Sequence, residues 1–189
     1  MLMLEQRIQQ QFFEGADLLS QTADTLSRSI AQAAHALLGC ITAGGKVLFV
    51  STGSGSALAT YGAAILVGRF ERERPPLAAL ALGGAGDAEA RALEVQALGA
   101  PGDVLVALAA GNNAAALLPC VRAAQSKEMV VIALTGSESA ELDKALSETD
   151  VHIAVPHERT ARVQEVHLLA LHCLADAVDL QLMGEQDSP

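Results

Sequence analysis

The sequence predicts an α/β domain: a three-layer sandwich with a five-stranded parallel sheet, preceded by an N-terminal helical hairpin. Short apolar runs alternate with longer stretches of helical period along most of the chain. These runs are continuously apolar, which is typical of strands covered by helices on both faces. The chain has 189 residues, of which 51% are hydrophobic and only 3% aromatic. This length and composition suit a single domain with a closely packed core.

The first 42 residues have a helical period. Apolar side chains recur at three- and four-residue spacing, first from Ile8 to Leu19 and again from Leu26 to Ile41. We expect two helices with a break near residues 20–24 and an end at Gly44. Because an α/β unit is complete without this hairpin, we expect residues 1–42 to take part in oligomerisation.

The rest of the chain alternates strands and helices. The expected strands are Lys46–Val50, Leu77–Leu82, Val104–Ala109, Met129–Thr135 and Val151–Val155. The expected helices run from the loop after the first strand to about Phe70, over Asp87–Leu98 and Asn113–Ser126, briefly near Glu141, and over Thr160–Met183. We expect one domain over residues 1–189, with a flexible tail at 184–189.

The charge and the cysteines exclude several classes of function. A net charge of −10 repels phosphate backbones, so we expect no direct contact with nucleic acid. The three cysteines are widely separated, which favours neither a zinc ribbon nor a disulfide framework. No apolar run reaches the length of a membrane span and the N-terminus becomes polar early, so we expect no membrane segment and a cytoplasmic location.

A Gly/Ser loop follows the first expected strand and opens a helix. Its residues are Ser51, Thr52, Gly53, Ser54, Gly55 and Ser56. Glycines allow close approach of the backbone, and free N–H groups and hydroxyls at a helix N-terminus can hold a phosphate. The alternative is a tight strand–helix turn capped by Ser or Thr.

Five segments carry a resemblance to a known family. They are the Gly/Ser loop, Gly68–Pro75, Gly102–Leu105, Ile132–Gly136, and Arg162–His167 together with His172. In order and spacing they resemble the phosphoheptose isomerase group of the sugar-isomerase (SIS) family. The resemblance covers nearly the whole chain and implies a flavodoxin-like SIS domain.

The sequence departs from that group at the positions that carry its chemistry. The resemblance implies a metal-binding His and a catalytic Glu four residues apart, where this chain has Tyr61 and Ile65. An aliphatic side chain can neither shuttle a proton nor bind zinc. Gln164 and His172 match the family's second pair, but two ligands from one helix make a poor metal site. We therefore predict no catalytic residue, no metal and no cofactor.

The second phosphate loop is also altered. The family has an S-T-S-G-N-S stretch where this chain has Ala109–Ala114, and the segment Gly83–Asp87 is shorter than in the isomerases. His157, before the last helix, either lines the mouth of the site or is an ordinary loop histidine. We predict a vestigial phosphosugar site made of the six residues of the Gly/Ser loop with Asn112, Asn113, Gln164 and His172.

Within the SIS family, Arg69–Pro75 and Thr160–His167 are most similar to the DiaA group of DnaA initiator-associating proteins. That resemblance implies a homotetramer that binds DnaA and regulates the initiation of DNA replication. We therefore interpret the chain as a non-catalytic, DiaA-like regulator. The alternatives are a phosphoheptose (sedoheptulose 7-phosphate) isomerase and a phosphosugar-binding sensor.

The end of the last expected helix is a candidate partner surface. Leu182 and Met183 are apolar and lie just before a polar tail. We expect them either to contact DnaA or to complete a tetramer interface.

Overall fold

A computed structural model describes residues 2–83 and 87–184. At its centre is a sheet of five parallel strands in the order β2-β1-β3-β4-β5. The strands are β1 (Val47–Ser51), β2 (Ala79–Ala81), β3 (Val104–Ala109), β4 (Val130–Thr135) and β5 (Val151–Ala154). This is the flavodoxin-like strand order, so the prediction of a five-stranded parallel sheet is confirmed.

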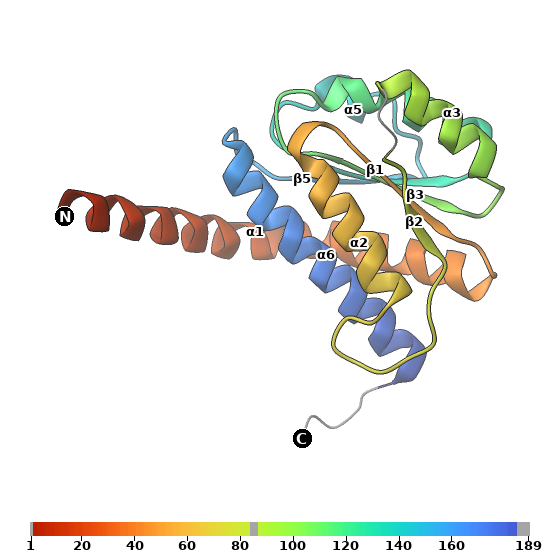
Figure 1. Cartoon of the computed structure of the whole chain (residues 1–189), viewed down its shortest axis with the longest axis horizontal. Helices are drawn as coiled ribbons and strands as arrows, with labels where there is room; N and C mark the ends of the chain where they lie inside the picture. Colours follow the sequence, from red (N-terminus) through yellow and green to blue (C-terminus); the bar gives the residue numbers. More distant parts are fainter. Residues whose placement is uncertain (1, 84–86, 185–189) are drawn as a thin grey trace.

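Helices cover both faces of the sheet and complete three layers (Figure 1). The helices are α1 (Leu2–Thr42), α2 (Ser56–Val67), α3 (Ala88–Leu98), α4 (Leu118–Ser126), α5 (Ala140–Asp143) and α6 (Thr160–Met183). Successive side chains of β1 enter different cores, because neighbours in a strand point to opposite faces. Val47 and Phe49 pack with α1, α2 and α6, whereas Leu48 and Val50 pack with α3, α4 and α5.

The predicted N-terminal hairpin is wrong: α1 is a single helix of 41 residues. The expected break at 20–24 contains no Gly or Pro, and its polar side chains are accommodated within the helix. Thr22 is buried, and its hydroxyl donates to the backbone oxygens of Leu18 and Leu19 at 2.8 and 3.2 Å. A threonine that bonds back to the preceding turn does not need to end a helix.

The first turns of α1 project beyond the body of the domain (Figure 1). They carry six large exposed apolar side chains: Leu2, Met3, Leu4, Ile8, Phe12 and Phe13. An apolar surface of this kind on a projecting helix is typical of an interaction site.

Helix α6 is long and apolar enough to span a membrane by length and composition, although we expected no such segment. Its apolar side chains have another explanation. Val163, Val166, Leu171, Leu174 and Val178 are buried in the core shared with α1 and α2. A core helix in a globular protein meets the same criterion.

One expected strand is shorter in the structure, and two expected segments lie partly outside the described residues. Strand β2 is shorter than the expected Leu77–Leu82, because the Leu77 backbone N–H donates to the Leu66 oxygen on α2 at 3.1 Å. Residues 84–86 of the shortened segment and residues 185–189 of the expected tail lie outside the described residues.

Candidate functional site

The Gly/Ser loop lies at the carboxyl end of β1, where open parallel sheets bind ligands. Gly53 has a φ of +57°, which side chains other than glycine adopt only with strain. A Cβ on Gly55 would lie 3.3 Å from the Ser51 Cβ. Two N–H groups are used inside the fold, since Thr52 donates to the Leu108 oxygen and Gly55 to the Thr52 oxygen. Ser54 and Ser56 are exposed at the rim of this loop.

Two hydrogen-bonded pairs of polar side chains lie along α6, one at this loop and one further along α2. The Gln164 amide donates to the Ser54 hydroxyl at 2.7 Å. Two turns further along α6, the His172 Nε2 atom lies 2.8 Å from the Tyr61 hydroxyl of α2. The structure therefore pairs Ser54 with Gln164, two residues of the predicted site, and pairs His172 of that site with Tyr61.

The residues along the contact between α2 and α6, which we call the seam, do not fit a zinc ion. Ile65, one turn beyond Tyr61, is buried and carries no donor atom. The amide of Gln164 and the imidazole of His172 are each hydrogen-bonded to a side chain of the seam. Over residues 2–83 and 87–184, no three His, Cys, Asp or Glu side chains come together as a metal site. We therefore derive no step of the chemistry through a metal.

A polar cavity of about 240 Å³ lies beyond the carboxyl ends of β3, β4 and β5. It is lined by Ala110, Gly111, Asn112, Gly136, Ser137, Glu138, His157, Glu158 and Thr160. Asn112, a predicted site residue, and His157, which the sequence left open, therefore both line this cavity. Asn113 is exposed and precedes a short 3-10 turn (Ala114–Leu117), outside this lining.

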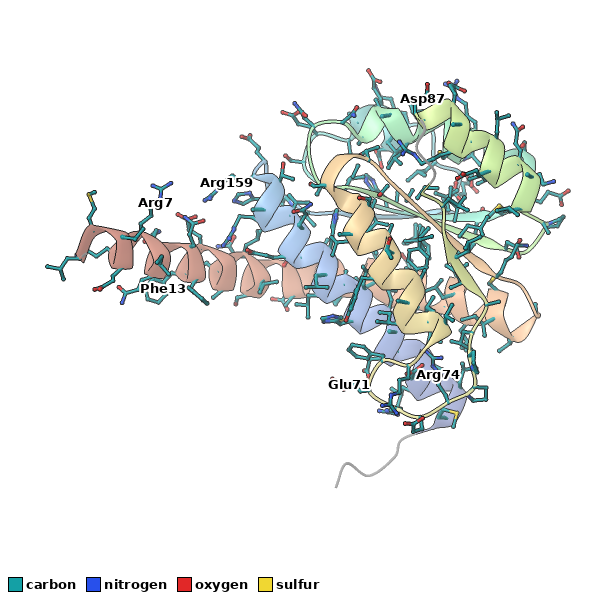
Figure 2. All side chains as sticks on the ribbon, viewed as in Figure 1. Arg7, Phe13, Glu71, Arg74, Asp87 and Arg159 are labelled. Atoms are coloured by element: carbon teal, nitrogen blue, oxygen red, sulfur yellow. The ribbon has the colours of Figure 1, made fainter. Side chains whose placement is uncertain are left out.

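The cavity lining carries acidic rather than basic side chains. Glu138 and Glu158 line it, and the lining described here includes no Lys or Arg. The nearest arginine in sequence, Arg159, turns toward α1, where it pairs with Glu14 and donates to the Gln11 side chain at 2.9 Å (Figure 2). The positive charge is thereby directed away from the cavity, so an anion bound here depends on backbone N–H groups and hydroxyls.

A buried histidine connects α6 to the end of β4, one residue before Gly136 of the cavity lining. His167 of α6 has no exposed surface, and its Nε2 atom lies 3.2 Å from the Thr135 backbone oxygen at the end of β4. Burial lowers the pKa of His167 from 6.5 to about 4, although the hydrogen bond to Thr135 acts in the opposite direction. The Thr135 hydroxyl lies 2.9 Å from His152, which in turn pairs with Asp143. His167 is therefore neutral near pH 7 and fixes α6 to β4.

The candidate partner residues lie far from the seam, at the other end of α6. Leu182 is half-buried against the main core, whereas Met183 is 41% exposed. Of these two residues, Met183 alone has a largely exposed side chain that a partner could contact.

Sequence reasoning missed two groups of residues near the site. Ser137, Glu138 and Glu158 follow strands β4 and β5 and could have been found from their place after those strands. Phe70 stacks on His172, with ring centroids 5.1 Å apart. It lies in an irregular segment, where no periodicity indicates which side chains turn inward.

The comparisons with known proteins agree with the fold. The family model of the SIS domain matches residues 11–136. A phosphoheptose isomerase of Methylibium petroleiphilum is 57% identical over 196 residues, covering 98% of each chain. The solved phosphoheptose isomerases of Neisseria gonorrhoeae and Francisella tularensis are 34% and 35% identical, with TM-scores of 0.84 and 0.86. They cover 93% and 92% of this chain, and 98% and 97% of their own.

The chain belongs to the SIS domain family. Within it, the relatives to which the chain is similar over almost its full length are named phosphoheptose isomerase. This finding contradicts our interpretation of the chain as a non-catalytic, DiaA-like regulator of replication initiation. That interpretation gave too much weight to three local departures, at Tyr61 and Ile65, in Ala109–Ala114 and in Gly83–Asp87, against likeness over the whole chain.

Proposed function

We propose that this chain is a phosphoheptose isomerase whose proton transfers are carried by Tyr61 and His172. The observation that carries the proposal is the 2.8 Å contact between the Tyr61 hydroxyl and the His172 Nε2 atom, at the α2–α6 seam two turns of α6 beyond the Gly/Ser loop. The likeness to phosphoheptose isomerases at 57% and 42% identity supports the substrate class.

Aldose–ketose isomerisation needs a group that removes a proton from one carbon and returns it to its neighbour. Ile65 cannot be that group, because its side chain has no ionisable atom. Histidine is the side chain most often used for general acid–base catalysis, and tyrosine is also used. In this proposal the Nε2–H group of His172 donates to the Tyr61 oxygen, and the Nδ1 atom accepts the carbon-bound proton and returns it to the neighbouring carbon. The Tyr61 hydroxyl donates to or accepts from a sugar oxygen.

The phosphate is held by the Gly/Ser loop in this proposal. Ser54 and Ser56 present hydroxyls at the N-terminus of α2, where the helix dipole favours an anion. The sugar then extends from the loop along α2 and α6 toward Tyr61 and His172, and the Gln164 amide can donate hydrogen bonds to its hydroxyl groups. This arrangement keeps the phosphate away from the carboxylates of the cavity.

A second candidate function is phosphosugar binding without turnover, as in a sensor. The observation that favours it is Ile65, which is buried at the position where the family resemblance implies a catalytic glutamate. In that case the seam recognises the sugar but moves no proton.

One experiment separates the two candidates. Calorimetric titration with sedoheptulose 7-phosphate measures binding, and a coupled assay measures formation of the aldose phosphate. The isomerase proposal predicts both binding and turnover, with turnover lowered about 10²–10⁴-fold in His172→Gln. Binding without turnover supports the sensor, and absence of both contradicts the proposed function.

The matched variant for the phosphate loop is Ser54→Ala. Because a hydrogen bond to a charged group contributes about 1.5 kcal/mol or more, we expect affinity for the phosphosugar to fall about 10-fold. Ser27→Ala on the exposed face of α1 makes the same chemical change far from the loop and is the control. Equal affinities of Ser54→Ala and Ser27→Ala would show that the phosphate binds elsewhere.

A further inference from the structure

The segment between α2 and β2, residues 68–78, passes along the seam of the candidate site. It has no regular secondary structure, yet it places one aromatic ring against the site. The ring of Phe70 stacks on that of His172, with centroids 5.1 Å apart and planes inclined by 29°. The Tyr61 ring meets His172 edge-on, with centroids 5.6 Å apart. The His172 imidazole is therefore in contact with two aromatic side chains, stacked on Phe70 and hydrogen-bonded to Tyr61.

A buried arginine fixes this segment to both helices. Arg74 and its partner Asp179 on α6 each expose only 1% of the side chain, and the Arg74 Nε atom lies 2.5 Å from the Asp179 carboxylate. The same guanidinium donates to the backbone oxygens of Ile65 and Leu66 at 2.8 and 2.9 Å. Figure 2 shows Arg74 in the loop that passes the ends of α2 and α6.

The Arg74 guanidinium has two structural roles. The last carbonyl groups of a helix lack partners within the helix, and Arg74 satisfies two of them at the end of α2. A guanidinium has five donors in a fixed planar fork, so it ties α2, α6 and the segment together at one point. Phe70, four residues before Arg74, is thereby held at one position along α6, next to His172.

We propose that Phe70 is a positioning residue for His172, and that the Arg74–Asp179 pair locks it in place. The stacked ring restricts rotation of the imidazole, so that the Nε2 atom stays directed at the Tyr61 hydroxyl. The role in catalysis rests on the proposed function, whereas the positioning of the ring does not depend on it.

The test observes the His172 ring directly in the ligand-free protein. A long-range ¹H–¹⁵N spectrum of the five imidazoles is recorded, and His172→Gln identifies the His172 signals. In the wild type we expect ring protons shifted upfield by the stacked Phe70 ring. In Phe70→Leu, which keeps an apolar side chain without the ring, both protons move downfield. Phe70→Tyr keeps the ring and restores the wild-type positions.

The lock is tested by a pair of matched variants on the same segment. Arg74→Lys keeps the charge but loses the fork, and we expect the His172 ring protons to move downfield as in Phe70→Leu. Arg72→Lys makes the same exchange at a side chain that is 25% exposed and bonded to the Gly184 oxygen, and it leaves the His172 signals in place. Circular dichroism confirms that each variant is folded.

Unchanged His172 signals in folded Phe70→Leu overturn the positioning role. Unchanged signals in Arg74→Lys overturn the lock. If the signals respond as expected but the wild type neither binds nor converts sedoheptulose 7-phosphate, the positioning of the ring stands and the proposed function fails. If the wild type converts the sugar, Phe70→Leu lowers kcat more than it raises KM, because the ring acts through His172.

Discussion

Acidification from pH 7 to pH 5 should destabilise the protein through a single buried side chain, His167. Burial lowers the pKa of His167 from 6.5 to about 4 in the folded state. Between these two values the unfolded chain binds a proton at this position and the folded chain does not. Stability from this residue is therefore fully present above about pH 6.5 and is lost as the pH falls toward 4.

The magnitude follows from the two pKa values. One pKa unit corresponds to about 1.36 kcal/mol, and the linkage relation integrated from pH 7 to pH 5 gives a loss of about 2 kcal/mol. Because His167 has no exposed surface, solvent does not screen this term. Asp103 is expected to contribute mainly at lower pH. Burial raises the pKa of its carboxyl, but hydrogen bonds from Lys46 and Ala100 outweigh this and lower it below 3.8.

The assay is urea unfolding at pH 7, 6 and 5, at one protein concentration, for the wild type and for His167→Gln. The glutamine amide keeps a donor for the Thr135 oxygen but does not titrate. We expect the free energy of unfolding of the variant to change by about 2 kcal/mol less than that of the wild type over this range. His35→Gln, on the exposed face of α1, serves as the control. Parallel pH dependences of wild type and His167→Gln would refute the reasoning.

Three further predictions concern the lock, the helix–sheet contact and the N-terminal helix. Arg74→Met should lower the free energy of unfolding by about 3–5 kcal/mol, because it leaves the Asp179 carboxylate buried without a cation; a loss under about 1 kcal/mol in urea unfolding contradicts this. Gly62→Ala should cost about 1–3 kcal/mol by thermal or urea unfolding, since its Cβ would lie 2.6 Å from the buried Phe49 ring; unchanged stability means that the ring moves freely. We also propose that the chain forms a homotetramer through the projecting part of α1, so that Phe12→Ser lowers the mass measured by light scattering. A wild type that runs as a 19.5 kDa monomer at micromolar concentration contradicts this proposal.

The sheet was predictable because its strands are short, apolar and buried on both faces. Val104–Ala109 is buried at every position, and this is the pattern that the sequence shows as a continuous apolar run. Strand β2 was less well defined, because Ala79–Ala81 lies at the sheet edge and is only partly buried. The ends of such a strand depend on contacts with α2 that no local pattern records.

The continuity of α1 could not be read from its own residues. The polar stretch around Thr22 resembles a turn in sequence, but α1 packs against α6, Thr22 is buried and the stretch remains helical. Tertiary contacts often override local preference in this way. Conversely, Ser54, Gln164 and His172 were selected from motifs, and the structure places them at one seam.

The pairing of Tyr61 with His172 was beyond sequence reasoning, because the two residues are 111 positions apart and lie on different helices. From the sequence, we interpreted Tyr61 only as the loss of a metal-binding histidine. In the structure it is the hydrogen-bond partner of the remaining one. The functional expectation is contradicted by the likeness to phosphoheptose isomerases, and in our proposal the Tyr61–His172 pair takes the place of the missing His and Glu.

The most direct test of the account is solvent exchange in D₂O. Isomerisation of sedoheptulose 7-phosphate through an enediol exchanges a proton at C1 of the ketose with solvent, which NMR detects even when little aldose accumulates. The account predicts exchange catalysed by the wild type and lost in His172→Gln, with Tyr61→Phe reduced. Absence of exchange in wild-type protein saturated with the sugar, or undiminished exchange in His172→Gln, contradicts the assignment of the chemistry to the Tyr61–His172 pair.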